Sequence, residues 1–370
     1  MSTKGTVQKM IKGLYVHIPF CNSICGYCDF ARCRYSSSLA DKYLMHLEKE
    51  LSEIKQDSFY TVYIGGGTPT SLNEKQLERL LEMLSRFKAE KEYTIEINPE
   101  SFNREKALLI KKYGVNRVSI GIQSFNESLL AHMGRKHNSK DVDNTFRYLD
   151  EAGIKNRSID LIFGFQTQSL ANVITDLQKA VRLNVTHISI YDLEIYPNTI
   201  FGIKRYEKLD DETCFIMYQS IVEYLNLHGY RQYETSNFAF GRYQSQHNRL
   251  YWKYEDYKGV GLSASSKIRN IRTDNTKNFV DYLNDRYVAK TIRLSDEELI
   301  FEAIMMNLRM NEGIDIKEFD KRFNCNLLEK HHLAIEKNIA KGLLEVKSGF
   351  LKTTNKGIFV LNDILVDFMN

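Results

Sequence analysis

Residues 14–28 read LYVHIPFCNSICGYC, a short apolar run that is followed at once by three cysteines in one loop. Cys21, Cys25 and Cys28 are separated by three and then two residues, and Tyr27 precedes the third cysteine. Thiolates are the ligands that iron–sulfur clusters need, and three of them leave one iron of a 4Fe-4S cluster without a protein ligand. We therefore expect a buried strand that ends in a 4Fe-4S site with one open coordination position.

The N-terminal half alternates short runs of β-branched and aromatic residues with segments of helical periodicity, as parallel strands joined by helices do. Six strands are expected, at residues 14–20, 61–67, 93–99, 117–124, 158–164 and 187–194. A doubly wound sheet would suit this alternation almost as well. However, unusual polar and glycine residues follow the first five strands, and a site built from successive strand ends is typical of a barrel. The sequence thus predicts an α/β fold with a partial (β/α)6 barrel.

The pattern changes after about residue 236. Residues 241–295 carry eleven Lys or Arg against five Asp or Glu, with aromatic residues between them. From residue 296, helical segments lead to a hairpin-like stretch at 343–354 and a last helix, which is the pattern of a winged-helix module. We predict three parts: the barrel with the cluster at 1–236, a basic aromatic connecting region at 237–295, and a smaller C-terminal α+β winged-helix-like domain at 296–370.

Composition and charge exclude several classes of protein. No apolar stretch is long enough to cross a membrane, and the start, MSTKGTVQKMIKG, lacks the apolar core of a signal peptide, so we expect a cytoplasmic location. A net charge of +4 is too small to imply a nucleic-acid partner. In a reducing cytosol, the crowded cysteines favour a metal site over disulfides. Zinc is the alternative, although it would want a second Cys pair or added His, and we treat Cys33, Cys214 and Cys325 as ordinary thiols.

Two further features suit a ligand site at the strand ends. Gly65-Gly66-Gly67-Thr68-Pro69 ends the second strand, and glycines there let the backbone approach a ligand closely. Tyr15 and His17 share one strand face, which we expect to point into the barrel, whereas Val16 and Ile18 suit the helix layer.

The cysteine spacing, with an aromatic residue before the third cysteine, resembles the hallmark of radical S-adenosylmethionine (SAM) enzymes. This resemblance implies that the amine and carboxylate of SAM chelate the open iron, and that an electron from the cluster cleaves the sulfonium to a 5′-deoxyadenosyl radical. Carboxylates would then accept from the ribose hydroxyls, and Arg135 would fork onto the methionine carboxylate. The positions that the resemblance assigns to SAM are Tyr15, Tyr27, Gly66, Gly67, Thr68, Glu96, Gln123, Arg135 and Asp160.

Nearly the whole chain resembles the coproporphyrinogen III dehydrogenase group, and within it the HemW-type haem chaperones. Cys28 is followed by Asp29-Phe30, whereas the dehydrogenases continue as Cys-x-Cys. Residues 247–252, HNRLYW, match the HemW pattern His-Asn-x-x-Tyr-Trp that is associated with haem binding. The resemblance implies that His247 is an axial ligand of haem iron. Without it, a capping or core histidine is the ordinary interpretation.

The sequence departs from the family at two places. Residues 164–169 read GFQTQS where the family usually has GLPGQT, and residues 261–265 read GLSAS where a more glycine-rich form is usual. The first change would alter a loop over the adenosine, and the second a haem or lid contact. Neither touches the cluster ligands.

The leading hypothesis is a haem chaperone that carries a SAM-ligated 4Fe-4S cluster and passes haem to an acceptor protein. An electron donor and a peripheral contact between the basic region and a membrane would be its further partners. The alternative is an oxygen-independent coproporphyrinogen III dehydrogenase, an enzyme that removes two carboxyl groups from a porphyrinogen. A zinc-stabilised binding module is a third hypothesis.

Overall fold

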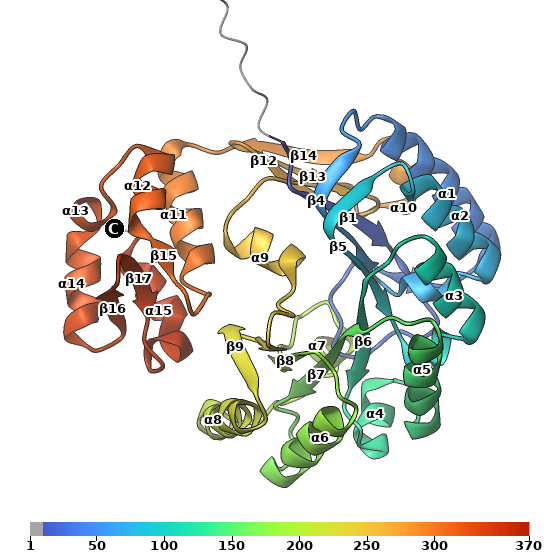
Figure 1. Ribbon diagram of the computed structural model, residues 1–370, viewed down its shortest axis with the longest axis horizontal. Coiled ribbons are helices and arrows are strands. Elements are labelled where there is room, and N and C mark those ends of the chain that lie inside the picture. Colours follow the sequence, from blue (N-terminus) through green and yellow to red (C-terminus); the bar gives the residue numbers. More distant parts are fainter. Residues whose placement is uncertain (1–9, 370) are drawn as a thin grey trace, which may run out of the picture.

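Six parallel strands form the centre of a curved sheet (Figure 1). Each pairs in parallel with the next, in the order in which they occur along the chain. They are β1 (Gly13–Ile18), β4 (Ser58–Gly66), β5 (Lys88–Ile97), β6 (Arg117–Gln123), β7 (Asn156–Phe163) and β8 (His187–Asp192). This computed structural model describes residues 10–369. Residues 1–9 lie outside it; they belong to the predicted barrel domain 1–236 and to the N-terminal stretch in which no signal peptide is expected. The predicted partial (β/α)6 barrel is confirmed.

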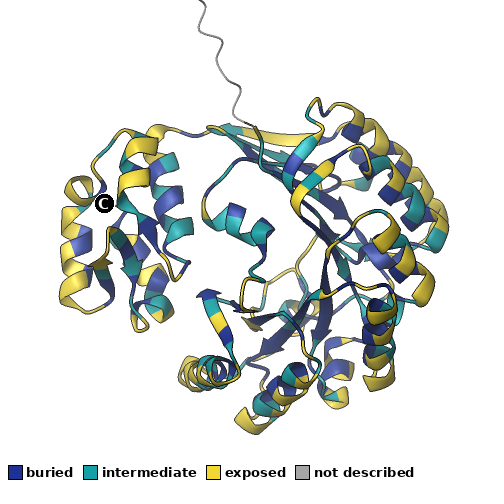
Figure 2. Cartoon of the chain, viewed as in Figure 1, coloured by how far each residue is buried: buried dark blue, intermediate teal, exposed yellow. Residues whose placement is uncertain are grey.

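Helices connect these strands and cover the outer face of the sheet (Figure 2). Their buried faces are the apolar stripes that the sequence shows: Leu77, Leu80, Leu81 and Leu84 are fully buried in one core cluster. Ser169 caps the helix after β7, because its side chain accepts from the Asn172 amide. The connecting helices are α1 (Ser37–Ser52), η1 (Pro69–Ser71), α2 (Glu74–Leu84), η2 (Pro99–Ser101), α3 (Arg104–Lys112), α4 (Glu127–Met133), α5 (Ser139–Glu151) and α6 (Leu170–Arg182).

The first strand is shorter than predicted. It ends at Ile18, because Pro19 has no backbone N–H to continue the ladder. The next two residues form β2 (Phe20–Cys21), which pairs in parallel with β3 (Cys33–Arg34) and leaves the barrel sheet. The cysteine loop therefore begins on its own small two-stranded sheet rather than on the barrel strand.

Later strands extend the sheet at both ends. Beside β1 lies β11 (Tyr257–Val260), which is parallel to it, and beyond it the antiparallel strands β12 (Ser265–Ile268), β13 (Ile271–Asn275) and β14 (Val288–Arg293). Beside β8 lie the antiparallel strands β10 (Asn237–Phe240) and β9 (Tyr230–Glu234). Residues 237–293, in the predicted connecting region, thus add strands on both sides of the six parallel strands in one twelve-stranded sheet.

Four further helices accompany these strands. They are α7 (Ile200–Ile203), α8 (Asp211–Leu227), α9 (Gln246–Trp252) and α10 (Phe279–Tyr282). Helix α9 lies on the concave side of the sheet, between the strands and the C-terminal domain (Figure 1), and contacts β4, β5 and α11. The motif predicted to bind haem is therefore inside the barrel rather than on its surface.

The C-terminal part has the order of a winged-helix domain. It contains α11 (Asp296–Asn307), β15 (Ile314–Asp315), α12 (Ile316–Phe323), α13 (Leu327–Lys330), α14 (His332–Ala340), β16 (Leu344–Lys347), β17 (Phe350–Thr353), η3 (Gly357–Val360) and α15 (Leu361–Asp367). The three strands form a separate sheet, and Ser348 and Gly349, both at positive φ, make the two-residue hairpin turn. This domain packs around its own apolar core. Among residues 10–369, no helix is both long and apolar enough to span a bilayer.

Candidate cluster and SAM site

Cys21 ends β2, Cys25 and Cys28 lie in the loop that follows it, and all three are free thiols. Cys21 and Cys25 are buried, Cys28 is half-buried, and the Cys28 amide donates to the Cys25 carbonyl at 3.4 Å. Gly26 fixes the loop between two helices, because its amide donates to Met133 of α4 and its carbonyl accepts from the Phe201 amide of α7, both at 2.9 Å. A Cβ at Gly26 would lie 2.4 Å from the Phe201 ring, so glycine is required there.

Burial favours the protonated thiol at two of these cysteines, Cys21 and Cys28. It raises the pKa of Cys21 to about 12 and also raises the pKa of Cys28. The neighbouring cysteines add to the effect on Cys21, because thiolates repel one another. Iron binding must therefore displace protons from this site.

Arg135 supplies a cationic group beside the cysteine loop. Its Nη2 donates to Asn98 Oδ1 at 3.1 Å and to the Gly121 carbonyl, and its guanidinium lies 3.5 Å from Glu100. The side chain also interacts with Cys25, whereas its Nε is buried and has no hydrogen-bond partner among residues 10–369. A buried unpaired donor fits an anionic ligand. The three free thiols and this guanidinium thus fit a cluster whose open iron binds a carboxylate-bearing ligand. Within residues 10–369, no group of three or more His, Cys, Asp or Glu side chains is arranged to hold a single metal ion.

The glycine-rich end of β4 folds over the start of the cysteine loop. The Gly67 amide donates to the Ile18 carbonyl at 2.9 Å and the Thr68 amide to the Phe20 carbonyl at 2.7 Å. Gly66 has φ +106°, and a Cβ there would lie 2.4 Å from the His17 ring. The Thr68 hydroxyl lies 3.7 Å from Cys21 Sγ, which places the predicted SAM loop against a predicted cluster ligand.

Two half-buried carboxyl groups face the barrel interior from β5 and β7. Glu96 accepts from the Tyr63 hydroxyl at 2.7 Å and from the Gly66 amide at 3.1 Å. Burial raises the pKa of Glu96 to about 7, against the lowering effect of Tyr63. Asp160 accepts from Ser119 Oγ at 3.3 Å, and burial raises its pKa too. Carboxyl groups held in this way suit the hydroxyls of a ribose.

The remaining predicted SAM residues lie along the same strand ends. The Tyr15 hydroxyl lies 3.1 Å from His17 Nδ1, and the Tyr15 ring stacks on Tyr63. Gln123 ends β6 at φ 68°, where the pairing with β7 is irregular. Burial raises the pKa of Tyr27, which lies beside Cys25 and Arg135. The structure therefore brings the nine predicted SAM positions to one end of the barrel, and their role in SAM binding stays a prediction.

His247 lies elsewhere, and its ring is closed off. It is 1% exposed, with Nδ1 2.7 Å from Thr61 Oγ1 and Nε2 2.8 Å from the Tyr251 hydroxyl. Burial lowers its pKa to about 3, so the imidazole is neutral. Haem ligation by His247 stays a prediction, and it requires Thr61 or Tyr251 to release a ring nitrogen.

Three site residues escape the sequence analysis. Asn98 donates to Thr68 Oγ1 at 2.8 Å and accepts from Arg135. It lies two residues after Glu96, so the alternation of side chains along a strand could have placed it on the same face. Tyr63 is paired in register with Tyr15, which only the strand pairing reveals. Glu92 is a buried glutamate in the interior of a strand, a position where an unpaired charge is rare.

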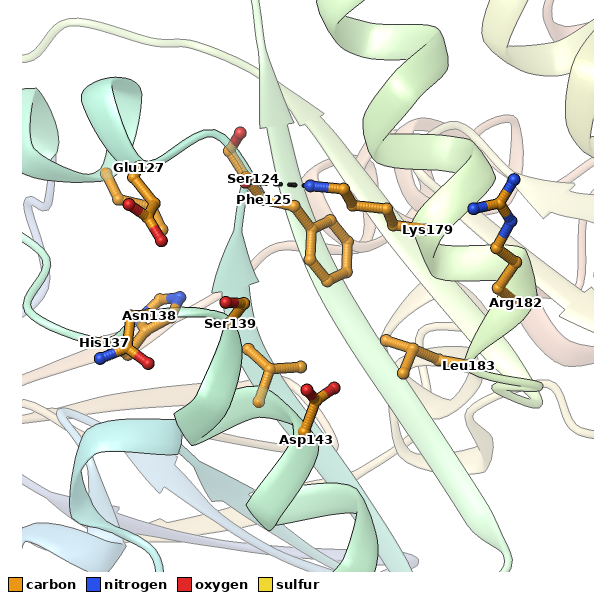
Figure 3. A pocket seen from close by; sticks show the side chains of 12 residues that line it. Ser124, Phe125, Glu127, His137, Asn138, Ser139, Asp143, Lys179, Arg182 and Leu183 are labelled. Atoms are coloured by element: carbon orange, nitrogen blue, oxygen red, sulfur yellow. Dashed lines mark hydrogen bonds between the residues drawn. The ribbon is translucent and has the colours of Figure 1, made fainter.

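A separate cavity of about 280 Å³ lies outside the barrel (Figure 3). It is lined by residues of α4, α5 and α6 and by the end of β6, among them Phe125, Val142, Lys179 and Leu183. Lys179 donates to the Phe125 carbonyl at 3.4 Å. None of the predicted cluster, SAM or haem residues lines it.

The raised pKa of Glu96 predicts that SAM binding depends on pH. Below a pKa of about 7 the carboxyl holds its proton and is the poorer acceptor for ribose hydroxyls, so affinity should rise with pH. Anaerobic calorimetry of the reconstituted protein should show about tenfold tighter binding at about pH 8 than at about pH 6. Because the SAM amine also titrates, Glu96→Gln is the control, and it should flatten most of the slope. An equal slope in both proteins would contradict the assignment.

Comparison with known proteins identifies the family. Residues 15–180 match the family model of the radical SAM superfamily, and residues 294–360 match that of the HemN C-terminal domain. The heme chaperone HemW of Bacillus subtilis is 34% identical over 97% of this chain and 99% of its own, and that of Buchnera aphidicola subsp. Schizaphis graminum is 36% identical over 96% and 98%. The coproporphyrinogen III oxidase HemN from Escherichia coli shares the fold, with a TM-score of 0.84 at 22% identity over 97% of this chain and 90% of that chain. The chain therefore belongs to the HemW family of the radical SAM superfamily.

Proposed function

We propose that this protein is a haem chaperone that binds haem together with a SAM-ligated 4Fe-4S cluster and passes the haem to an acceptor protein. The full-length similarity to heme chaperones named HemW carries the proposal. The three free thiols in one loop and the buried Arg135 beside them support the cofactors. When bound, the cluster and SAM supply one-electron chemistry.

Different residues of the chain hold the cluster and SAM in this proposal. Cys21, Cys25 and Cys28 ligate the cluster, and the Arg135 guanidinium pairs with the SAM carboxylate. The remaining positions surround the methionine and adenosyl parts of SAM: Tyr15, Tyr27, Gly66, Gly67, Thr68, Glu96, Gln123 and Asp160. The predicted domains 1–236, 237–295 and 296–370 remain part of this proposal, with the middle part completing the barrel sheet.

Two finer partners belong to the same proposal. An electron donor must reduce the cluster if SAM is to be cleaved. A membrane contact would use Arg269, Lys277, Lys290 and Arg293, which are exposed and make no ion pair within residues 10–369. Co-sedimentation with anionic vesicles, lost when these four are replaced by glutamine, tests this contact.

An anaerobic haem titration of the cluster-reconstituted protein tests the chaperone function. We expect saturable binding of one haem per chain, seen as a shift of the haem absorbance band, and transfer of that haem to an apo haem protein. Iron-free protoporphyrin is the control for axial ligation. Failure to bind either ferric or ferrous haem would overturn the proposal, whereas unchanged binding by His247→Ala would remove only His247 as the ligand.

The dehydrogenase remains the alternative in the same superfamily. The likeness to the oxidase at 22% identity establishes the fold alone, so we do not extend that activity to this chain. Formation of protoporphyrinogen from coproporphyrinogen, SAM and a reductant would support the dehydrogenase activity. Formation of 5′-deoxyadenosine without that product would reject it.

A further inference from the structure

A series of contacts joins α9 to Glu96, one of the carboxyl groups that are predicted to bind SAM. Glu92 Oε2 accepts from the Gln246 amide at 2.9 Å and Glu92 Oε1 from the His247 amide at 3.1 Å, so β5 anchors the first turn of α9. Four residues further along β5, Glu96 accepts the Tyr63 hydroxyl. The same strand therefore holds both the helix that carries His247 and the carboxylate that receives Tyr63.

The Tyr63 ring stacks on two other rings. His247 stacks on it with the centroids 5.0 Å apart and the planes at 29°, and Tyr15 stacks on it at 6.1 Å and 30°. Stacking contacts restrict the torsion of the ring, and the hydroxyl of Tyr63 is thereby aimed at Glu96. Because burial keeps Tyr63 protonated, the group always acts as a donor toward Glu96.

The His247 ring is itself fixed from both ends. Thr61 on β4 holds one nitrogen and Tyr251 on α9 holds the other, so the ring cannot rotate away from Tyr63 without breaking a buried hydrogen bond. A Cβ on Gly13 of β1 would lie 3.4 Å from the His247 ring, so the ring is also closely packed from below.

We propose that Tyr63 is a positioning residue that orients Glu96 for SAM, and that His247 acts on the SAM site through the Tyr63 ring. The inference deepens the proposed function and rests on its SAM site, because it gives the haem-associated motif a second role that needs no haem. Asp160, Arg117 and the Gly66 amide also face Glu96, and Tyr15 lies nearby, so Tyr63 is one of several groups that set its charge.

The pH midpoint of SAM binding measures this role, since a purely structural residue would not move it. Tyr63→Phe keeps the ring and removes the donor, so the midpoint should move to higher pH and affinity near pH 7 should fall about tenfold. Tyr251→Phe is the comparison variant: it removes a hydroxyl that holds His247 and does not contact Glu96, so it should move the midpoint less than Tyr63→Phe does.

Two substitutions separate the ring of His247 from its hydrogen bonds. His247→Gln keeps polar atoms for Thr61 and Tyr251 but loses the aromatic ring, and it should shift the midpoint in the direction of Tyr63→Phe. His247→Phe keeps an aromatic ring against Tyr63. The pH midpoint of this variant should therefore stay near the wild-type value, even though the two imidazole nitrogens are lost. Adding Tyr63→Phe to His247→Gln should give less than the sum of the two effects.

The outcomes decide between the two proposals. If the wild type binds SAM but His247→Gln keeps the wild-type midpoint, or if His247→Phe shifts as His247→Gln does, the positioning role is overturned. An unshifted Tyr63→Phe would overturn it too. If the reconstituted wild type binds no SAM at all, the proposed function itself fails.

Discussion

Replacing Cys25 by alanine should leave the reconstituted protein with almost no iron–sulfur cluster. Two thiolates remain in the loop, and a cubane that has lost one of its three protein ligands dissociates or degrades readily. We expect iron and sulfide to fall from about four of each per chain to near background. Metal analysis and the loss of the broad visible absorbance measure this.

Cys33→Ala is the matched control for this prediction. Cys33 is half-buried on β3, close to the loop and free, yet it is not among the predicted ligands. Its substitution should leave iron and sulfide at the wild-type level. A cluster retained by Cys25→Ala would contradict the ligand assignment, and zinc in place of iron in the wild type would favour the zinc-site hypothesis instead.

Replacing Glu92 by alanine should give the largest loss of stability. Its carboxylate is 3% exposed, lies 4.0 Å from Arg117 Nε and accepts the first amides of α9. Removal leaves Arg117, which is 2% exposed, without its ion-pair partner, so that only the carboxyl groups of Glu96 and Asp160 still attract this buried cation. Breaking such a pair costs about 3–5 kcal/mol of unfolding free energy, and a lowered urea or thermal midpoint should show it.

Glu90→Ala is the control on the same strand. Glu90 is exposed and accepts only from Ser58, so its loss should change the unfolding free energy by no more than about 0.5 kcal/mol. Similar midpoints for the two variants would mean that the buried pair contributes little. The Glu92 variant should also bind SAM less tightly, since α9 then loses its anchor to β5.

The barrel could be predicted because its causes are local. The segments that form β4 to β8 are short and rich in β-branched residues, and Ser169 is a typical N-cap residue at the start of a helix. The end of β1 was wrong by two residues, because the prediction ran the strand through residue 20 although Pro19 cannot continue the ladder. The cysteine loop and the strand-end carboxyl groups could be predicted because the motif and the strand order place them together.

What the sequence did not show depends on contacts between distant segments. The surroundings of His247 come from β4, and nothing in HNRLYW indicates that Thr61 will hold the ring. The role of Tyr63 follows from the register that sets it opposite Tyr15. The three-part division at residues 236 and 295 followed composition, and composition does not reveal that β11 pairs with β1.

That pairing has a consequence during synthesis. The ribosome releases β1 first, whereas its partner β11 emerges only after residue 260 has been made. Until then the nascent barrel carries a bare hydrogen-bonding edge, which is a template for aggregation with other chains. A chain truncated at residue 236 would keep the β1 edge unpaired permanently, so the segment after the predicted boundary covers an edge that would otherwise favour aggregation.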